Sequence, residues 1–295
     1  MKLAGLLAIA ALLTAPGAGA RVTRAQYLMG TICEISADSP EEIDGAFAEA
    51  RRVEAMLSTW RDDSELTAVN RGAIPGTELA ALLRTALWWS DATQHAFDPR
   101  VRPLIDIWKT RADGALPTDE QLAQAMVLVR GGQQLEEGAF GKGYALDRML
   151  STIHGQTVIN FGGQIVVRGA HQVTVADPSH RDHAVIAFSL SSGSLSTSSG
   201  SEKTFDVGGR RFSHILDPRT GVALPPRGSV SVVHPSALVA DILSTALYVM
   251  DWEEGLAWAR AHEVTAIFID EHNTVRASVP LPGLTMLDRR FTIGE

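Results

Sequence analysis

The segment at 213–221, with the sequence SHILDPRTG, contains the residue types that most directly suggest chemistry. His214 titrates near neutral pH and could act as a general base. Asp217 could orient the imidazole, and Arg219 could contact a phosphate group. The same residues also describe a well-capped β-turn that carries an exposed histidine. Taken alone, the segment is equally compatible with a catalytic loop and with a plain turn.

The pair Asp241 and Thr245 lies in a segment that predicts a helix. A spacing of four residues places a carboxylate and a hydroxyl on the same helix face, one turn apart. Mg²⁺ prefers a few such protein oxygens together with water and phosphate oxygens. By itself the pair is more typical of a solvated or capping helix face. It indicates a metal site only in combination with other segments.

Two glycine-containing turns could let the backbone approach a ligand closely. The GKGY turn at 141–144 precedes a predicted helix, whose N-terminus favours anions. It is neither a Walker A loop nor a dinucleotide fingerprint, because Gly143 and Leu146 occupy positions that those motifs give to other residues. The glycine pair at 162–163 follows a predicted strand. A tight turn is the alternative interpretation of both.

Other polar residues are interpreted as follows. Asp98 could accept hydrogen bonds from a base edge or ribose, or simply form an Asp-Pro turn. His180 and His183 could be a metal pair, but their polar surroundings predict a solvated turn. The stretch at 189–201 is rich in serine and glycine and is predicted to be a functional loop. It contains no G-x-S-x-G elbow, which argues against a serine hydrolase.

The chain has 295 residues, of which 45% are hydrophobic and 20% are charged. These values predict one large domain, or two merged ones, with a sizeable core. The formal net charge of −8 argues against a nucleic-acid partner. An anionic dinucleotide would need local help from a metal ion, helix N-termini or a few cationic side chains.

The first 20 residues have the pattern of a secretory signal peptide. Lys2 is followed by an apolar run at 3–13 that is too short to span a bilayer, and AGA at 18–20 is a small-residue cleavage site. A buried N-terminal helix is the alternative. Cys33, the only cysteine, lies beyond the cleavage site and is expected to be a packed residue, neither a lipid anchor nor a nucleophile. No later segment is expected to span a membrane.

The predicted elements give the fold class. A strand is expected at 26–36, then a helix with Ser39 as N-cap, Pro40 at its first position and Glu42 completing a capping box. Further helices are expected at about 77–95, from Thr118 with Gln121 in a capping box, and at about 143–153, 237–250 and 253–262. Strands are expected at 157–161, 164–168, 172–175, 184–190, 229–233, 264–269 and near the C-terminus. Because strands and helices do not alternate, we predict an α+β fold.

Eight segments, in this order, resemble the ApbE family, the FAD:protein FMN transferases. They are MGT at 29–31, LSTWRDDSELTAVN at 57–70, AFDPRVRPLIDIWK at 96–109, GKGYALD at 141–147, NFGGQIVVRG at 160–169, LSTSSG at 195–200, SHILDPRTG at 213–221 and ADILSTAL at 240–247. The resemblance implies an ApbE-like, T-fold-like α+β domain over 21–295, with mixed, largely antiparallel sheets, packed helices and compact merged subdomains.

The resemblance also implies roles for particular residues. The positions that match the family's FAD contacts are Met29, Trp60, Ala96, Phe97, Asp98, Gly138, Tyr144, His214 and Ile215. The positions that match its Mg²⁺ ligands are Asp241, Thr245 and the backbone carbonyl of Gly141, with Ser244 close by. His214 matches the residue proposed as the general base.

The chain departs from the family pattern in three places, and the last two bear on FAD contacts and acceptor choice. Trp60 stands where Tyr is common, although either ring can stack on a flavin or adenine. The stretch at 137–140 differs from the usual Asp-Leu-Gly-Gly lead-in. The stretch at 198–205 lacks the usual acidic and Tyr pattern.

The implied activity is Mg²⁺-dependent transfer of FMN from FAD to a Thr or Ser hydroxyl of an acceptor protein, with release of AMP. The expected acceptor is a subunit of a respiratory electron-transfer complex. The enzyme is expected in the periplasm, without a lipid anchor. Two alternatives are an FAD pyrophosphatase that yields FMN and AMP, and a non-catalytic flavin-binding or carrier protein.

Overall fold

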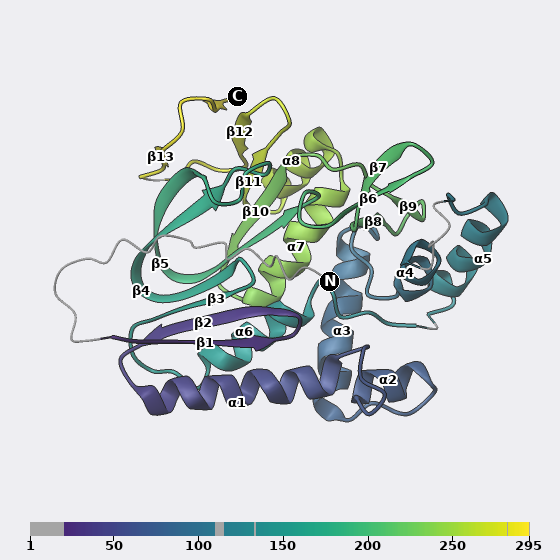
Figure 1. Cartoon of the computed structure of the whole chain (residues 1–295), viewed down its shortest axis with the longest axis horizontal. Helices are drawn as coiled ribbons and strands as arrows, with labels where there is room; N and C mark the ends of the chain where they lie inside the picture. The colour runs from purple at the N-terminus through teal and green to yellow at the C-terminus, as the bar shows by residue number, and fades with distance from the viewer. Residues whose placement is uncertain (1–20, 110–114, 133, 282, 295) are drawn as a thin grey trace.

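A computed structural model describes residues 21–109, 115–132, 134–281 and 283–294. The strands of these residues form one large, largely antiparallel sheet and two small two-stranded sheets, with helices packed against them (Figure 1). This arrangement confirms the predicted α+β class. The predicted signal peptide at 1–20 lies outside the described residues.

The elements have the following bounds. The helices are α1 (Pro40–Leu57), α2 (Glu65–Asn70), α3 (Thr77–Ala92), α4 (Arg102–Lys109), α5 (Asp119–Arg130), α6 (Gly141–Leu150), α7 (Ala237–Val249) and α8 (Trp252–Ala261). The strands are β1 (Val22–Leu28), β2 (Thr31–Ala37), β3 (Thr157–Phe161), β4 (Gln164–Ala176), β5 (Ala184–Ser199), β6 (Thr204–Val207), β7 (Arg210–Ser213), β8 (Leu216–Asp217), β9 (Val222–Ala223), β10 (Ser229–His234), β11 (Thr265–Ile269), β12 (Thr274–Ala277), β13 (Thr285–Met286) and β14 (Thr292–Ile293).

The large sheet has the order β1-β2-β3-β4-β5-β10-β11-β12-β14, and β13 pairs with β5. The strand predicted at 26–36 is wrong as a single element, because the chain reverses at Met29 and Gly30 to form the β1–β2 hairpin. Both residues have positive φ, 45° and 76°. The apolar pattern runs on through the turn, so periodicity alone could not reveal the reversal.

The two long central strands correct two further predictions. β4 is continuous over the two strands predicted at 164–168 and 172–175, with a register shift between Arg168 and His171. The serine-rich stretch predicted as a loop is strand as far as Ser199, because β5 pairs with both β4 and β10 there. Buried serine hydroxyls find partners in the sheet, as when Ser194 Oγ donates to the carbonyl of Ile165 at 3.0 Å.

The glycine pair at 162–163 forms the two-residue turn between β3 and β4. Phe161 pairs with Gln164, and both glycines have positive φ, 62° and 93°. Two-residue hairpin turns with positive φ at both positions match the twist of the flanking strands. The pair therefore forms the tight turn that was the alternative to a ligand contact.

Helix ends agree in part with the expected signals. The capping box of Thr118 and Gln121 is confirmed. Ser39 caps α1, but the carboxylate of Glu42 does not complete the box, because it accepts the N–H of His154 at 3.1 Å. α3 ends at Ala92 and not at the predicted residue 95, α6 begins two residues before the predicted 143, and α2 and α4 were not predicted.

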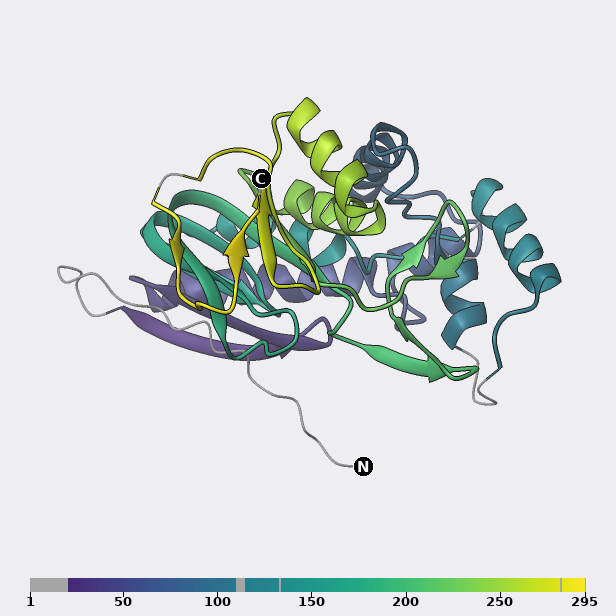
Figure 2. The ribbon, with the colours of Figure 1, turned by 90° about the horizontal axis from the view of Figure 1, so that it is seen from above.

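The sheet has a hydrophobic cluster on each of its two faces. The larger cluster joins one face to α1, α3, α6, α7 and α8 and includes Cys33, which is fully buried, as expected for a packed residue. The smaller cluster includes Val167, Ile186 and Phe291 and brings the C-terminal segment onto the other face (Figure 2). In the described parts of the chain, every helix is too short or too polar to span a bilayer.

Candidate functional site

Asp241 lies where α6 packs against α7. The N–H of Gly143 donates to Asp241 Oδ2 at 3.0 Å. A Cβ at position 143 would lie 2.4 Å from the carbonyl oxygen of Ala237 and 2.8 Å from Asp241 Cβ. Only glycine lets the two helices approach this closely. The glycines of the GKGY segment therefore help to place a carboxylate from α7 beside the first turn of α6.

The Asp241 carboxyl group is 5% exposed, and burial raises its pKa. The positive charge of Lys142, the N–H of Gly143 and the hydroxyl of Ser196 act in the opposite direction. Ser196 Oγ donates to Asp241 Oδ1 at 3.4 Å. A buried carboxylate is costly unless hydrogen bonds or a cation compensate it. This carboxylate is consequently a strong candidate for a cation ligand.

Hydroxyl groups from β5 extend the oxygen cluster along α7. Ser196 Oγ lies 3.2 Å from Ser244 Oγ, and Ser198 Oγ lies 3.0 Å from Ser244 Oγ and 3.2 Å from Thr245 Oγ1. Ser196 and Ser198 were not among the predicted site residues. Their i, i+2 spacing, which places side chains on one face of a strand, was the available signal. Because the stretch at 189–201 was predicted to be a loop, this strand spacing was not recognised.

Both ends of α7 are fixed by charged side chains. Asp147, at the end of GKGYALD, accepts the N–H groups of Ala237 and Leu238 at 2.6 and 3.1 Å. Arg227 donates to the carbonyl oxygens of Tyr248 and Met250, both at 2.7 Å. An anion at a helix N-terminus and a cation at its C-terminus both oppose the helix dipole. The helix that carries Asp241 is thus held in position from both ends.

His214 lies between β7 and β8, and its backbone N–H donates to the carbonyl of Lys203 at 2.9 Å. Its side chain is exposed, yet the surrounding protein desolvates the imidazole and lowers its pKa. The charge of Glu202 raises the pKa, whereas those of Lys203 and Lys142 lower it. Glu202 and Lys142 act on Asp241 as well. His214 and Asp241 therefore share one electrostatic environment.

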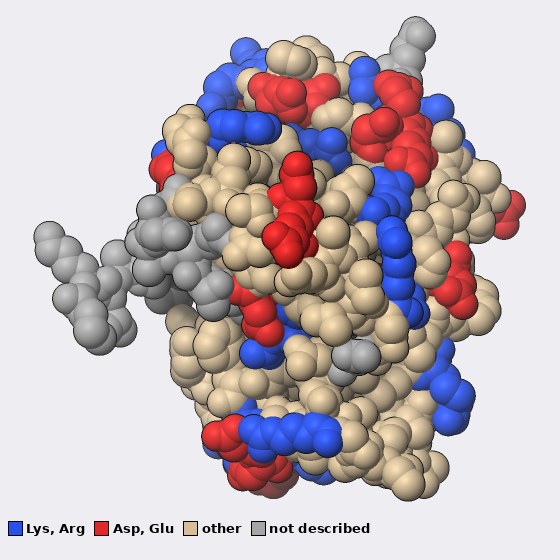
Figure 3. Space-filling view, turned by 90° about the vertical axis from the view of Figure 1, so that its right-hand side faces the viewer, with Lys and Arg blue, Asp and Glu red and all other residues tan. Residues whose placement is uncertain are grey.

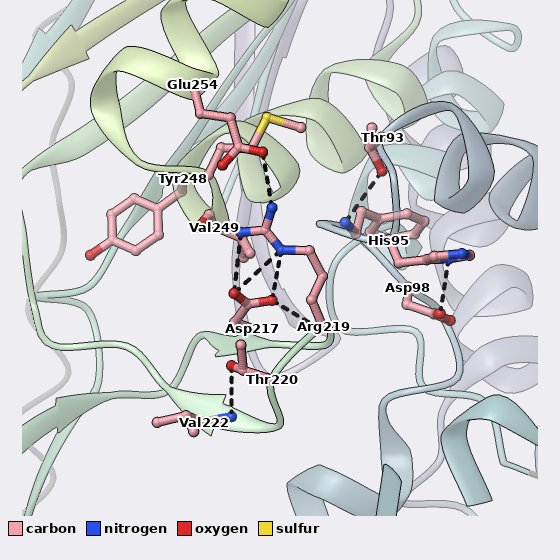
Figure 4. Close-up of polar contacts among 12 residues, drawn as sticks. Thr93, His95, Asp98, Asp217, Arg219, Thr220, Val222, Tyr248, Val249 and Glu254 are labelled. Atoms are coloured by element: carbon pink, nitrogen blue, oxygen red, sulfur yellow. Dashed lines mark hydrogen bonds and ion pairs between the residues drawn. The ribbon is translucent and has the colours of Figure 1, made fainter. Parts of the chain in front are cut away.

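Asp217 and Arg219 shape the turn that follows His214 (Figure 4). Asp217 Oδ1 accepts the backbone N–H of Arg219 at 2.8 Å and its Nε at 3.1 Å. The guanidinium also reaches Glu254 on α8, with Nη1 3.0 Å from Oε1. Because these groups are engaged with each other, Asp217 makes no polar contact with the imidazole of His214 within the described residues. The pair acts as a structural tie between the turn and α8.

Met29 lies against the start of α6. Its N–H donates to Glu54 Oε1 at 2.7 Å, and its Cε would be 3.4 Å from a Cβ at Gly141. Glu137, which precedes α6, accepts the N–H of Thr59 at 3.2 Å. Burial, together with the charge of the neighbouring residue 136, raises the pKa of the Glu137 carboxyl group. These contacts bring the β1–β2 turn and the segment after α1 to the same place.

The stretch at 96–98 is largely a packing and turn element. Ala96 and Phe97 are buried, and the Phe97 ring packs edge-on against Phe140, with centroids 6.4 Å apart. Asp98 is 5% exposed, and its carboxylate accepts the N–H of Arg100 at 2.9 Å and the guanidinium at 2.7 and 2.8 Å. The Asp98 side chain therefore has the turn-forming role that was its alternative interpretation.

The remaining predicted contact residues differ in their surroundings. Trp60 is 80% exposed and Gly138 is exposed, whereas Ile215 is 7% exposed. The Tyr144 hydroxyl donates to Glu78 on α3 at 2.5 Å, and burial raises its pKa to about 12. The structure thus groups Asp241 with the hydroxyls of Ser196, Ser198, Ser244 and Thr245, while the Tyr144 hydroxyl is engaged with α3.

The oxygen donors around Asp241 fit Mg²⁺ chemically. The Asp241 carboxylate and the nearby hydroxyls of Ser244 and Thr245 are hard oxygen donors. The backbone carbonyl of Gly141, at the start of α6, is a donor of the same kind. Among the described residues, no group of three or more His, Cys, Asp or Glu side chains could hold a metal ion. A metal here would rely on few protein ligands and on substrate oxygens, which is typical of Mg²⁺.

A separate cavity of about 420 Å³ lies behind α7. Trp88, His234 and Trp258 contribute to its lining, as does Leu243 of α7. Asp241 instead contacts α6 and β5, on another face of the same helix. The cavity is therefore not part of the site built around Asp241.

The sequence profile of the ApbE family matches residues 29–268. The chain belongs to the ApbE family. The ApbE match contains all the candidate residues from Met29 to Thr245, so the resemblance seen in the sequence is confirmed. The last strands lie beyond the matched span.

Individual ApbE relatives cover most of the chain. A FAD:protein FMN transferase of Treponema pallidum is 28% identical over 337 aligned positions, covering 94% of this chain and 93% of that protein. One from Klebsiella pneumoniae is 28% identical, covering 79% and 84%. Among solved structures, the ApbE protein of Thermotoga maritima has a TM-score of 0.79 at 24% identity, covering 87% and 96%. The flavin transferase ApbE from Vibrio cholerae has a TM-score of 0.73 at 23% identity, covering 85% and 94%. These structural likenesses show the fold.

Proposed function

We propose that the protein is a Mg²⁺-dependent FAD:protein FMN transferase that acts on a Thr or Ser hydroxyl of an acceptor protein and releases AMP. The observation that supports this most directly is the buried carboxylate of Asp241, which adjoins a line of hydroxyls and shares its electrostatic environment with His214. This combination suits phosphoryl transfer, in which the enzyme mainly positions groups and stabilises charge.

The proposed reaction replaces the phosphoanhydride bond of FAD with a phosphoester bond to the acceptor. The acceptor hydroxyl oxygen bonds to the FMN-side phosphorus, the bond from that phosphorus to the AMP-side oxygen breaks, and AMP leaves. Asp241, Thr245 and the Gly141 carbonyl would hold Mg²⁺, with Ser244 beside them. The bound ion would supply charge stabilisation for the pyrophosphate oxygens.

His214 is proposed to take the proton of the acceptor hydroxyl. Because its pKa is lowered, the imidazole is mostly neutral at pH 7 and available as a base. Its side chain is exposed, so a hydroxyl on another protein can reach it. General bases of this kind typically contribute about 10²–10⁴-fold to the rate.

The FAD would lie along residues from several elements. Met29 and Ile215 offer apolar contact, and the exposed ring of Trp60 can stack on a flavin or adenine ring. Gly138 leaves open space before α6, since a Cβ there would meet no atom closer than 3.8 Å. The stretch at 96–98 would contribute mainly through its backbone, because its side chains are buried or paired.

Two other functions compete with this proposal. In an FAD pyrophosphatase, water would replace the acceptor hydroxyl, and the exposure of His214 is compatible with that. A non-catalytic flavin carrier has less support, because a binding protein has no need to bury the carboxylate of Asp241 beside hydroxyl oxygens.

We further propose that the acceptor is a subunit of a respiratory electron-transfer complex and that the protein acts in the periplasm after export. On the face shown in Figure 3, Lys and Arg side chains are interspersed with Asp and Glu. Such a surface provides no single-sign field for nucleic acid, whereas it is compatible with a protein partner.

The decisive experiment incubates the mature protein with FAD, Mg²⁺ and candidate acceptor subunits, and measures FMN on Thr or Ser by mass spectrometry and AMP by chromatography. Asp241→Asn should abolish labelling and retain the fold. Asp206→Asn, which alters an exposed carboxylate paired with Arg211, is the matched control and should label normally.

Each alternative has a distinct outcome. Rapid AMP release without an acceptor supports the pyrophosphatase. A protein that retains FAD unchanged under all conditions supports the carrier. Labelling by Asp241→Asn at the wild-type rate overturns the metal assignment.

A further inference from the structure

The segment at 201–203 lies directly beside His214. The carbonyl of Lys203 accepts the backbone N–H of His214 at 2.9 Å, just before the hairpin of β6 and β7 begins. Ser201 and Glu202 precede it, and the N–H of Glu202 bonds to the carbonyl of Ser199 at 3.5 Å. This is also the stretch in which the sequence departs from the ApbE pattern. The backbone of His214 is thus tied to the segment at 201–203.

A second loop, at 177–183 between β4 and β5, holds this segment from outside. Arg181 Nη2 lies 3.0 Å from Glu202 Oε1. The hydroxyl of Ser201 donates to the carbonyl of Pro178. Two separate contacts therefore join the loop to the segment that supports His214.

The loop itself is firmly anchored. Asp177, which is 3% exposed, accepts the N–H of Ser179 at 2.7 Å and the guanidinium of Arg290 at 3.0 Å. The Arg181 guanidinium lies over the β3–β4 turn, where Nη2 would be 3.3 Å from a Cβ at Gly163. Because the loop is tied to the body of the protein, its contact with Glu202 can restrain the segment at 201–203.

We infer that Arg181 and Glu202 form a clamp that positions His214, so that both are positioning residues for FMN transfer. This inference rests on the proposed function of His214 as the base. Neither residue is required to touch FAD or the acceptor. Their side chains are 41% and 30% exposed, and partly exposed ion pairs contribute little to global stability. The clamp therefore acts locally, on the segment that carries the Lys203 carbonyl.

The clamp also fixes the charges around the imidazole. The charged groups that act on His214 are Glu202 and Lys203 on the clamped segment and Lys142 on α6. Glu202 alone among them raises the pKa of His214. Because Arg181 holds Glu202 in place, the charge of Glu202 continues to offset the lowering of the His214 pKa by desolvation and by the two lysines.

The test combines steady-state kinetics with an NMR titration of the His214 imidazole. Glu202→Gln should lower the pKa of His214, which moves the acid limb of the pH–rate profile to lower pH. Both Glu202→Gln and Arg181→Gln should reduce kcat by roughly ten- to a hundred-fold, as expected for a small misplacement of a catalytic group. KM for FAD should be unchanged. The double variant should be no slower than the slower single variant, because the two residues act as one unit.

The matched control is the neighbouring exposed pair on the β6–β7 hairpin, changed by Asp206→Asn and Arg211→Gln. These variants should leave kcat and the His214 titration unchanged. An unshifted His214 titration in Glu202→Gln, or fully additive losses in the double variant, would overturn the clamp. The NMR titration needs no turnover, so a wild-type protein that transfers no FMN would refute the proposed function and still leave the effect of Glu202 on His214 measurable.

Discussion

Gly143 faces α7 without a side chain, at a place where any other residue would bring its Cβ against that helix. The nearest atoms to such a carbon are the Ala237 carbonyl oxygen and the Leu238 Cα, both in the backbone, and Asp241 Cβ. Backbone atoms cannot move aside without moving the helix. This one position therefore couples the spacing of α6 and α7 to the location of the candidate metal ligand.

We expect Gly143→Ala to destabilise the protein by about 1–3 kcal/mol, the usual cost of inserting a methyl group into a packed contact. FMN transfer should fall as well, because Asp241 moves with α7. Urea unfolding and the labelling assay measure the two effects. Gly45→Ala is the control, since a Cβ there meets nothing within 4 Å on the exposed face of α1. It should gain about 0.5–1 kcal/mol from helix propensity. Equal stabilities of the two variants would contradict the packing role of Gly143.

The sequence indicated candidate site residues but not the residues that contact them. Asp241 and Thr245 were visible as a pair because both lie in one helix, where spacing determines the shared face. Ser196, Ser198 and Glu202 were not identified, because their roles arise from contacts with α7 and with the loop at 177–183. Contacts between elements distant in sequence leave no local pattern. The partner of Tyr144 was missed for the same reason, because its hydroxyl bonds to Glu78, 66 residues away.

At the scale of elements, α7 depends on a cap supplied by another helix. Asp147 of α6 accepts two backbone N–H groups of α7 and the Ser236 hydroxyl at 2.6 Å. We expect Asp147→Ala to cost about 1–2 kcal/mol of stability, in the range of a lost N-cap, and to reduce FMN transfer. Thermal unfolding and labelling are the measurements.

Asp251 provides the comparison for that cap. It caps α8 through the N–H of Glu254 at 2.7 Å, on an exposed surface. Asp251→Ala should lose a similar stability and keep its transfer activity, because α8 carries no candidate catalytic residue. If both variants lose activity in proportion to stability, the Asp147 cap has no specific effect on the site.

Elements with strong local signals were predicted nearly to the residue. α7 differs from its predicted bounds by one residue at its C-terminal end, and α8 differs by one residue at each end. Ser236 and Asp251 are good N-caps for these helices. The β1–β2 hairpin and the full length of β5 were missed. The hairpin was missed because the apolar pattern runs on through its turn at Met29 and Gly30. The full length of β5 was missed because its pairing with the distant strand β10 outweighs the local preference of glycine and serine for loops.

At the scale of the whole molecule, the candidate site lies where the helical layer meets the sheet. The large cluster packs α6 and α7 on one sheet face, while β5 extends the hydroxyls of Ser196 and Ser198 toward α7. The sheet and the helices must therefore both form before the oxygen donors come together. A buried carboxylate at this junction stabilises a bound cation and opposes folding without one.

The raised pKa of Asp241 determines how the stability of the metal-free protein changes with pH. The folded state holds the proton more tightly than the unfolded state, in which the pKa is about 4. In EDTA, this group should therefore lower stability as the pH rises from about 4 through the folded pKa. Asp241→Asn removes the ionisation and should be more stable than wild type at pH 7, by on the order of 1 kcal/mol, although it is inactive.

Thermal unfolding from pH 4 to 8, with EDTA or with Mg²⁺, measures the effect of the Asp241 charge on stability. Mg²⁺ should raise the Tm of the wild type at pH 7, because the proposed site exists only in the folded state, and leave Asp241→Asn nearly unchanged. Asp206→Asn should respond to Mg²⁺ like the wild type, since its exposed carboxylate is paired with Arg211. A wild type that is more stable than Asp241→Asn in EDTA at pH 7 would show that hydrogen bonds from Gly143 and Ser196 already outweigh the cost of burying the charge, and that the site does not depend on a cation.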